Sequence, residues 1–542
     1  MEKSALKTIF PELFPKLTEF WKKLIDLKET KHMEKKNILV AVLEIGSTGI
    51  RLLVAEIFPD GRWQAMDRAS KPVALGRDVF TTGQVSRESF LECITLLKNF
   101  REFLRGWGID DSDIHTIATS ALRVARNRDI FVDRVRQETG LMVSIVDGIE
   151  ENRLMYLAVR FALRNDWPLF WRANSMILEI GGGSTEIMLL RRGQMVAAHS
   201  LKLGTILIDQ ASRIGSPHGQ ERYLSENIRN TSDFLSSELD LAHVRTFVIV
   251  GFDASIAGAQ VGRNLNENCW IVTRDDFSEF VRKVQNYSIE ECMEKLQMTY
   301  WDAETFITGI LINKLLLDRT GAAQVVVPRV SMREGLLIDL AQGIEPALQE
   351  DFFSQIFASA VNLGRKYHID EPHCRHVASL CMSLFDALAR EHGMNRRERM
   401  MLEAAAMIHD IGMFIRASSH NLHGQYIIAN TEIFGLRREE LDIIGNVIRY
   451  HRGAAPSSKD IDYIALQREE RILVLKMVSI LRVAEVLDRG HSQQVKLKTV
   501  EKKGETLVLN TDGIRDFSLE LLGLEEKCGL FQDVFGYKIV VN

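Results

Sequence analysis

One short pattern occurs twice in the chain, and this repeat constrains the fold more than any other feature. Residues 42–53 read VLEIGSTGIRLL, and residues 177–190 read ILEIGGGSTEIMLL. Each copy has an apolar run, a glutamate, a glycine turn with Ser and Thr, and a second apolar run. A Gly-rich turn between buried strands exposes backbone N–H groups that can hold phosphate oxygens. The repeat therefore predicts two related lobes whose turns face one cleft.

Glu44 and Glu179 occupy the same position in the two copies, directly before each turn. We expect them at the ends of adjacent strands that face the cleft, where carboxylates can hold a divalent metal between the lobes. A single copy would carry little information, because strand–glycine–strand hairpins are common. Two copies favour a ligand cleft of about 300–1,000 Å³.

Length, charge and cysteine usage limit the class of protein. With 542 residues the chain is too long for a single core, and about 150 residues per domain predicts about three or four domains. The formal net charge of −5 argues against a nucleic-acid coat or a polybasic membrane binder, so a polyanionic substrate needs basic residues gathered in one cleft. The cysteines form no CxxC pair, and no apolar run reaches the ~18–20 residues that cross a bilayer. We expect a cytoplasmic protein without nucleic-acid or membrane partners.

The order of strand and helix patterns divides the chain into five segments. Apolar residues recur at helical spacing in the first, and strands alternate with helices in the next two. The expected segments are an amphipathic N-terminal extension (1–36), two α/β lobes (37–172 and 173–344), an all-α domain (345–492) and a small α/β domain (493–542).

Two strand-to-helix junctions carry candidate site residues. Ser120 and Arg123 lie in ATSALRVARN, where a hydroxyl at a helix start is an ordinary N-cap, but together with a guanidinium it can also bind an anion. Glu150 and Glu151 begin the helix that follows Gly148. Helix dipoles favour acidic residues there, so capping alone would explain them. The alternative is a general base that activates water.

Taken together, these stretches resemble the exopolyphosphatase/guanosine pentaphosphate phosphohydrolase family, part of the two-lobed superfamily of sugar kinases, actin and Hsp70. The matching stretches, in the family's order, are EIGSTGIRLLV, ATSALRVARN, GIEENRLMYLAV, LEIGGGSTEIML, SLKLGT and SMREGLL. The resemblance implies actin-like lobes and a hydrolase that uses Mg²⁺, with Mn²⁺ as the alternative ion. The implied reaction removes the terminal phosphate of inorganic polyphosphate, or alternatively the 5′-phosphate of guanosine pentaphosphate. It also implies a homodimer.

Motif position within the resemblance assigns roles to individual residues. Glu151 matches the family's general base, and Glu186 and Glu179 match catalytic carboxylates. Glu44 and Glu179 stand where the family carries aspartates on the metal and phosphate side. The implied phosphate-binding residues are Gly46, Ser47, Thr48, Arg51, Ser120, Arg123, Gly181, Gly182, Gly183, Ser184, Thr185 and Gly204. Phosphoryl transfer depends mainly on positioning and charge neutralisation, which such a set can supply.

The chain also departs from the family pattern. Glu44 and Glu179 replace aspartates, Thr48 replaces an asparagine and Asn152 an alanine. One extra methylene displaces a carboxylate by about 1.5 Å, which is large beside a ~2.1 Å bond to Mg²⁺. A catalytically weak sensor of polyphosphate or nucleotide is therefore a further alternative. A kinase is disfavoured, because GFDASIAGA at 251–259 replaces the glycine-rich turn of an adenosine pocket.

The helical segment carries a second constellation, in the H…HD…D order of HD-type metal phosphohydrolases. Its members are His373, His409, Asp410 and Asp488. The linking segments add His420, His423 and His451. Imidazole and carboxylate ligands suit Mn²⁺, Fe or Zn²⁺. We expect an HD-like domain in which the four side chains converge but hold metal weakly or not at all, because the cleft already provides for phosphate chemistry and the His-rich stretch suits guiding a polyanion.

Overall fold

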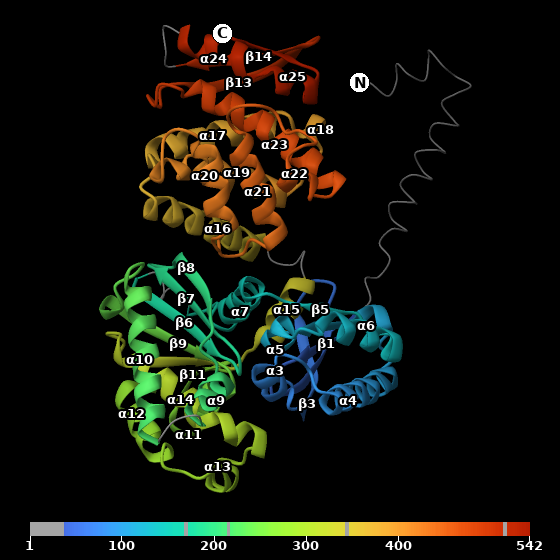
Figure 1. Ribbon diagram of the computed structural model, residues 1–542, viewed down its shortest axis with the longest axis vertical. Helices are drawn as coiled ribbons and strands as arrows, with labels where there is room; N and C mark the ends of the chain where they lie inside the picture. The colour runs from blue at the N-terminus through green and yellow to red at the C-terminus, as the bar shows by residue number, and fades with distance from the viewer. Residues whose placement is uncertain (1–36, 167–171, 214–216, 342–345, 513–517) are drawn as a thin grey trace, which may run out of the picture.

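The computed structural model describes residues 37–166, 172–213, 217–341, 346–512 and 518–542. Two α/β lobes lie side by side, a helical domain stacks on the second lobe, and a small sheet ends the chain (Figure 1). The amphipathic helix expected over residues 1–36 lies outside the described residues.

Lobe I is built on a five-stranded sheet in the order β3-β2-β1-β4-β5. Its strands are β1 (Ile38–Ile45), β2 (Gly49–Ile57), β3 (Trp63–Pro72), β4 (Ile114–Ala118) and β5 (Val143–Ile145). β1, β2 and β3 pair antiparallel, whereas β4 runs parallel to β1 and β5 parallel to β4. One face packs against α3 (Leu75–Thr82), α4 (Arg87–Gly106), α5 (Ser120–Val124) and α6 (Arg128–Thr139). Ser86 is the N-cap of α4, and its side chain accepts a hydrogen bond from the Ser89 N–H.

Lobe II repeats this plan and extends it. Its seven strands are ordered β10-β11-β12-β9-β6-β7-β8. They are β6 (Asn174–Ile180), β7 (Thr185–Arg191), β8 (Gln194–Leu201), β9 (Val244–Val250), β10 (Arg263–Asn266), β11 (Cys269–Thr273) and β12 (Gln324–Pro328). The run β8-β7-β6-β9-β12 matches β3-β2-β1-β4-β5 in order and strand direction. The sequence repeat is therefore a duplication of a whole sheet.

The helices of lobe II cover one face of its sheet. They are α9 (Thr205–Arg213), α10 (Pro217–Ser236), α11 (Phe252–Val261), α12 (Arg274–Val284), α13 (Ile289–Leu296) and α14 (Tyr300–Asp318). Strands covered on both faces read as nearly continuous apolar runs. This is why MILEI and TFVIVG show little alternation.

Two helices connect the lobes. α7 (Gly148–Ala162) leaves lobe I and contributes Met155 and Val159 to the core that includes Ile177 and Met188 of lobe II. α15 (Met332–Leu340) follows the last strand of lobe II in sequence but packs back on lobe I, where Leu337 joins the core of β1 and β2 (Figure 1).

The helical domain follows, as expected from the loss of strand patterns. It comprises α16 (Pro346–Lys366), α17 (Glu371–Ala387), α18 (Ala389–His392), α19 (Arg396–Ile408), the 3₁₀ turn η3 (Ile411–Phe414), α20 (His420–Ala429), α21 (Arg438–Tyr450), α22 (Ile461–Ile464) and α23 (Arg468–Leu487). The expected α/β end of the chain is also confirmed. It contains β13 (Lys496–Lys503), β14 (Thr506–Asp512), α24 (Ser518–Lys527), α25 (Gly529–Phe535) and β15 (Lys538–Val541).

α16 docks the helical domain on β8, the edge strand of the lobe II sheet. The Gln355 side chain accepts a hydrogen bond from the Met195 N–H (2.7 Å) and donates one to the Gly193 carbonyl (3.0 Å). Asn362 donates to the Met195 carbonyl (2.9 Å). Side-chain amides thus satisfy backbone groups that an open sheet edge would leave for another strand.

None of the helices in the described part of the chain is both long and apolar enough to cross a bilayer. The six cysteines are all free, and five of them are buried.

Candidate active-site cleft

A cavity of about 580 Å³ lies between the two lobes. Both repeated turns and both repeated glutamates line it, so the repeat correctly predicts their convergence on one cleft. The expectation that these glutamates end adjacent strands is wrong, because β1 and β6 belong to separate sheets. Each copy builds its own sheet, and the cleft forms where the two sheets present their glycine turns to each other.

The two turns close in the same way. The Gly46 N–H donates to the Gly49 carbonyl (2.9 Å), and the Gly181 N–H donates to the Ser184 carbonyl (2.8 Å). The ladder registers also match, since Glu44 lies opposite Arg51 and Glu179 lies opposite Glu186. The duplication therefore holds at the level of single backbone positions.

Contact between the turns explains their glycines. A Cβ added to Gly182 would lie 2.8 Å from the Cβ of Ser47, and one added to Gly204 would lie 2.3 Å from the Gly182 carbonyl oxygen. A larger residue at Gly182 would push the lobes apart, and one at Gly204 would push the lobe II turn away from the start of α9.

A helix start supports each turn from behind, and of the two supporting glycines only Gly204 was among the expected site residues. The Thr205 N–H, at the start of α9, donates to the Gly181 carbonyl (3.0 Å). In lobe I the Gly76 N–H, at the start of α3, donates to the Ser47 carbonyl (2.7 Å). The Leu-Gly dipeptide at 75–76 repeats the one at 203–204, and this repeat was the missed signal.

Eight of the expected phosphate-binding residues line the cavity: Gly46, Ser47, Thr48, Arg51, Ser120, Gly181, Gly182 and Ser184. Four others do not: Gly183, Thr185, Gly204 and Arg123. The Thr185 hydroxyl donates to the Leu203 carbonyl, so it stabilises the turn instead of facing the cleft. Arg123 acts through the carboxylate of Glu151, as described next.

Glu151 is buried at the start of α7 and is not the helix cap. Asp147 caps the helix, because its carboxylate accepts a hydrogen bond from the Glu150 N–H (2.8 Å). Arg123 Nη1 lies 2.5 Å from Glu151 Oε1. Glu151 is thus an acidic residue of the first turn but not the N-cap, and its carboxylate is held at the cavity wall by a guanidinium.

Glu186 lies beside Glu151 and shares its titration. Its carboxylate accepts hydrogen bonds from the Ser200 hydroxyl (2.8 Å) and the Asn152 amide (3.1 Å). Burial, reinforced by the charge of Glu151, raises the pKa of Glu186 well above its usual range. Burial also raises the pKa of Glu151, but Arg123 and a hydrogen bond from Glu186 favour its charged form. The two carboxyl groups therefore titrate as one pair, in which Arg123 favours the charged form of Glu151.

Glu179 completes a group of three acidic residues. Burial, followed by the charges of Glu44 and Glu151, raises the pKa of Glu179 to about 7. A divalent cation would relieve this repulsion, and carboxylate oxygens are the ligands that Mg²⁺ prefers. The donor set on this side of the cleft thus fits the expected metal.

Glu44 has different surroundings. Arg51 Nη1 lies 3.4 Å from one carboxylate oxygen, and Arg333 Nε lies 3.6 Å from the other. Arg51 also donates to the Thr48 hydroxyl (2.9 Å). Arg333, at the start of α15, lines the cavity and was not among the expected site residues. On this side the cleft presents cations suited to phosphate oxygens.

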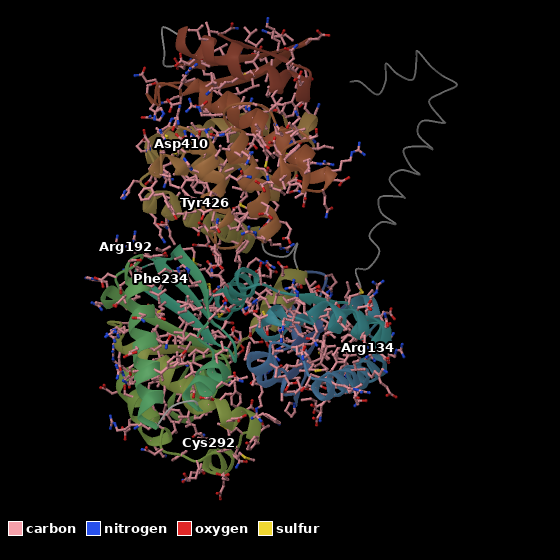
Figure 2. The ribbon with its side chains drawn as sticks, in the orientation of Figure 1. Arg134, Arg192, Phe234, Cys292, Asp410 and Tyr426 are labelled. Carbon is pink, nitrogen blue, oxygen red and sulfur yellow. The ribbon has the colours of Figure 1, made fainter. Side chains whose placement is uncertain are left out.

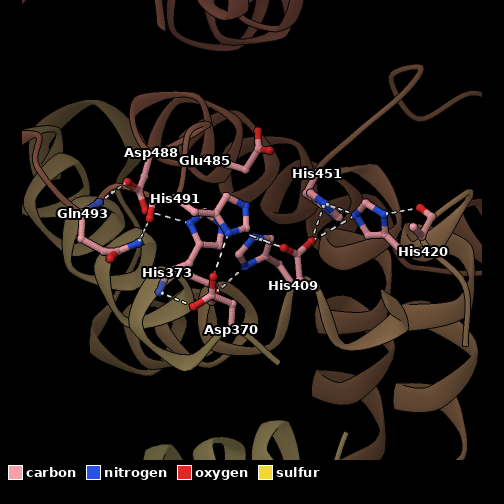
Figure 3. Close-up of polar contacts among 12 residues, drawn as sticks. Asp370, His373, His409, His420, His451, Glu485, Asp488, His491 and Gln493 are labelled. Atoms are coloured by element: carbon pink, nitrogen blue, oxygen red, sulfur yellow. Dashed lines mark hydrogen bonds and ion pairs between the residues drawn. The ribbon is translucent and has the colours of Figure 1, made fainter. Parts of the chain in front are cut away.

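The second constellation also converges, as expected. His373 Nε2 and His409 Nε2 lie 3.9 Å and 3.6 Å from Asp410 Oδ2. Asp488 lies behind His373 and accepts its Nδ1–H hydrogen bond (2.8 Å) (Figure 3). All four residues lie in the helical domain and none of them lines the cleft.

Comparison with known proteins identifies the family. Residues 53–343 match the Ppx/GppA phosphatase family, and residues 357–526 match Ppx/GppA phosphatase, domain III. A guanosine-5′-triphosphate,3′-diphosphate pyrophosphatase of Pseudoalteromonas atlantica is 24% identical over 460 residues, 83% of this chain and 86% of the relative. One from Aliivibrio fischeri is 23% identical over 487 residues, 88% of this chain and 92% of the relative.

Among solved structures, an exopolyphosphatase from Cytophaga hutchinsonii superposes with a TM-score of 0.51 at 18% identity, covering 57% of this chain and 99% of that one. This likeness concerns the fold alone. With one family match across the two lobes and another across the helical region, the chain belongs to the Ppx/GppA phosphatase family.

Proposed function

We propose that the cleft removes terminal phosphate from inorganic polyphosphate, using Mg²⁺ or, alternatively, Mn²⁺. The observation that carries this proposal is the position of Glu151, a carboxylate that Arg123 holds in the wall of a cavity that two glycine turns also line. A positioned carboxylate can take a proton from water, and free turn N–H groups can hold the phosphate that the water attacks.

The residues divide the work between the two lobes. The N–H groups of the turns and the guanidinium groups of Arg51 and Arg333 bind the terminal phosphates. Glu151 accepts the proton of the attacking water, while Arg123 fixes the orientation of its carboxylate. Glu44 and Glu179 are the candidates to hold Mg²⁺, with Glu186 opposite Glu179 in its hairpin, and the ion when bound would neutralise charge on the phosphate oxygens.

Guanosine pentaphosphate is the second candidate substrate. It is favoured by the relatives that align over more than four fifths of this chain, since those relatives bear the name of a guanosine-5′-triphosphate,3′-diphosphate pyrophosphatase. The two candidates share a terminal phosphoanhydride bond and differ in what lies beyond it. Phosphate release from each substrate, measured at equal concentration with Mg²⁺ and with Mn²⁺, decides between them. No release from either substrate would favour a sensor that binds without turnover.

We also propose that the helical domains pair two chains. Several exposed apolar side chains of this domain lie close together in sequence: Met413, Phe414, Ile415, Leu422 and Tyr426. Tyr426, labelled in the helical domain in Figure 2, is 67% exposed. Exposed apolar groups of this kind suit an interface. Light scattering should give the mass of a dimer, and Tyr426→Glu should give that of a monomer.

A further inference from the structure

Four histidines of the helical domain surround the carboxylate of Asp410. In each of them Nδ1 lies on the side of the ring that faces away from this carboxylate (Figure 3). The Nδ1 partners are the Asp488 carboxylate for His373 (2.8 Å), the Ala406 carbonyl for His409 (2.7 Å), the Ala417 carbonyl for His420 (3.0 Å) and the Ile448 carbonyl for His451 (2.6 Å). Carbonyl and carboxylate oxygens accept hydrogen bonds, so each Nδ1 carries a hydrogen. In a neutral ring Nε2 then keeps a free lone pair.

All four Nε2 atoms point at Asp410. Those of His420 and His451 lie 3.1 Å and 3.8 Å from Oδ1. Those of His409 and His373 lie 3.6 Å and 3.9 Å from Oδ2. Each carboxylate oxygen of Asp410 thus faces two imidazole nitrogens. A carboxylate that contributes one oxygen to each of two metal ions has this arrangement.

Hydrogen bonds explain only part of the cluster, in which His420 Nε2 lies 3.1 Å from Asp410 Oδ1. His409 is fully buried, and its Nε2 has no hydrogen-bond partner among the described residues. His420 Nε2 and His451 Nε2 lie 3.2 Å apart, although two neutral rings with Nδ1–H would direct lone pairs at each other. Buried polar groups without partners destabilise a fold, so apolar side chains would serve stability better here.

A metal ion accounts for these features. Two ligand atoms at about 2.0–2.1 Å from one ion lie about 2.9–3.4 Å apart. The His420–Asp410 and His420–His451 separations of 3.1 Å and 3.2 Å fall in this range. Outward Nδ1–H bonds to carbonyls and carboxylates are also what fixes histidine ligands around metals.

We propose that the helical domain holds divalent first-row transition-metal ions on Asp410. One position is formed by Asp410, His420 and His451, whose ligand atoms all lie within 4.8 Å of one another. A second, on the other carboxylate oxygen, is formed by Asp410, His373 and His491, with His409 beside it. Mixed imidazole and carboxylate ligands favour Mn²⁺, Fe²⁺, Co²⁺ or Zn²⁺ over Mg²⁺.

An entry path exists at His491. Its ring stacks on His373, with centroids 3.6 Å apart, and its side chain is 44% exposed. The remaining ligands are buried or nearly so. The expectation of weak or absent metal assigned the histidines of the linking segments to guiding a polyanion. The structure instead directs His420 and His451 at Asp410 and places Asp488 behind His373.

The test is metal binding by the full chain. Protein stripped with a chelator is dialysed against Co²⁺ in excess Mg²⁺, which occupies oxygen-only sites, and retained cobalt is measured by elemental analysis and by its visible absorption. We expect about one to two equivalents in the parent protein and less than about a tenth in Asp410→Asn, because Asp410 serves both positions. His451→Gln should lose the equivalent held with His420. His423→Gln is the matched control, since His423 shares α20 with His420 but belongs to neither ligand group.

The cleft variant Glu179→Gln separates this site from the active site and should retain cobalt like the parent. Cobalt lost from Glu179→Gln but kept by His451→Gln would overturn the proposal, as would loss from His423→Gln equal to that from His451→Gln. Because His451 is buried, His451→Gln can fail to fold. The parent protein therefore supplies a second measurement that needs no variant. Stripped parent protein should melt at a higher temperature after Co²⁺ or Mn²⁺ is added in excess Mg²⁺, and an unchanged melting temperature would contradict the site.

Discussion

The two glycine hairpins share a backbone plan but differ in the charge opposite the repeated glutamate. In lobe I, Glu44 lies opposite Arg51, and the pair is 3.4 Å apart. In lobe II the equivalent position opposite Glu179 is Glu186. One difference within a matching register therefore gives the cleft a cationic side and an acidic side. The two hairpins share their backbone geometry, and the side chain opposite the repeated glutamate gives the two sides of the cleft different charges.

This asymmetry matches what phosphoryl transfer requires. Phosphate oxygens need N–H groups and guanidinium groups, while the attacking water needs a base and any metal needs carboxylates. A cleft with two identical sides would serve one of these needs and oppose the other. The charge of Glu151 raises the pKa of both Glu179 and Glu186 in addition to their burial, whereas Glu44 pairs with Arg51 and Arg333.

The largest effect is expected on the acidic side. Glu151→Gln keeps the size and hydrogen-bonding shape of the side chain but removes the base, so kcat should fall by about 10²–10⁴-fold with KM nearly unchanged. Phosphate release from polyphosphate measures both constants. Glu150→Gln is the neighbouring control, because Glu150 pairs with Arg153 and does not line the cleft. Parental turnover in Glu151→Gln would remove Glu151 from the reaction.

The parts of this site that sequence could predict are local in the chain. Each hairpin is a continuous stretch, so its strands, its turn and its glutamate follow from one pattern of apolar and glycine residues. The repeat then implies convergence without any knowledge of the path between the copies. For the same reason the helix start at Glu150 and Glu151 was recognisable, although its cap, Asp147, was not.

What escaped prediction depends on tertiary contacts. Arg333 reaches the cleft because α15 returns to lobe I after the whole of lobe II, and no local pattern specifies that return. The GGGST turn shows two hydroxyls, but only the fold reveals that Thr185 turns away to the Leu203 carbonyl while Ser184 lines the cavity. Likewise, the Nε2 atoms of His420 and His451 meet Asp410 through the crossing of separate helices.

A smaller effect is expected on the cationic side. Arg51→Gln removes one guanidinium from the phosphate site, and KM for polyphosphate should rise about tenfold with little change in kcat, because the contact exists before and during the reaction. Arg134→Gln is the control, since Arg134 lies on the outer part of lobe I (Figure 2). A fall in kcat with unchanged KM would place Arg51 in the chemical step.

Shortening the repeated glutamates by one methylene tests whether the acidic and the cationic side of the cleft tolerate the same change. Glu179→Asp and Glu44→Asp restore the family's shorter side chain, and we expect turnover to stay level or to rise by up to about threefold if the longer chains hold Mg²⁺ awkwardly. Turnover across a series of Mg²⁺ concentrations is the measurement. A sharp loss in both variants would show that the cleft has adapted to glutamate on both sides.

The smallest effect concerns stability. The pKa of Glu179 is raised from 4.5 to about 7 in the folded protein, so its contribution to the free energy of unfolding is full below pH 4.5 and is lost as pH rises through 7. In chelator, the melting temperature should therefore fall between pH 5.5 and pH 8 by about 2–4 °C more in the parent than in Glu179→Gln, which does not titrate. Thermal scans at both pH values give this difference, and adding Mg²⁺ should reduce it. An equal dependence of melting temperature on pH in the two proteins would mean that charge repulsion does not destabilise the acidic side of the cleft. The contrast with Glu44, which two arginines neutralise, would then have no electrostatic basis.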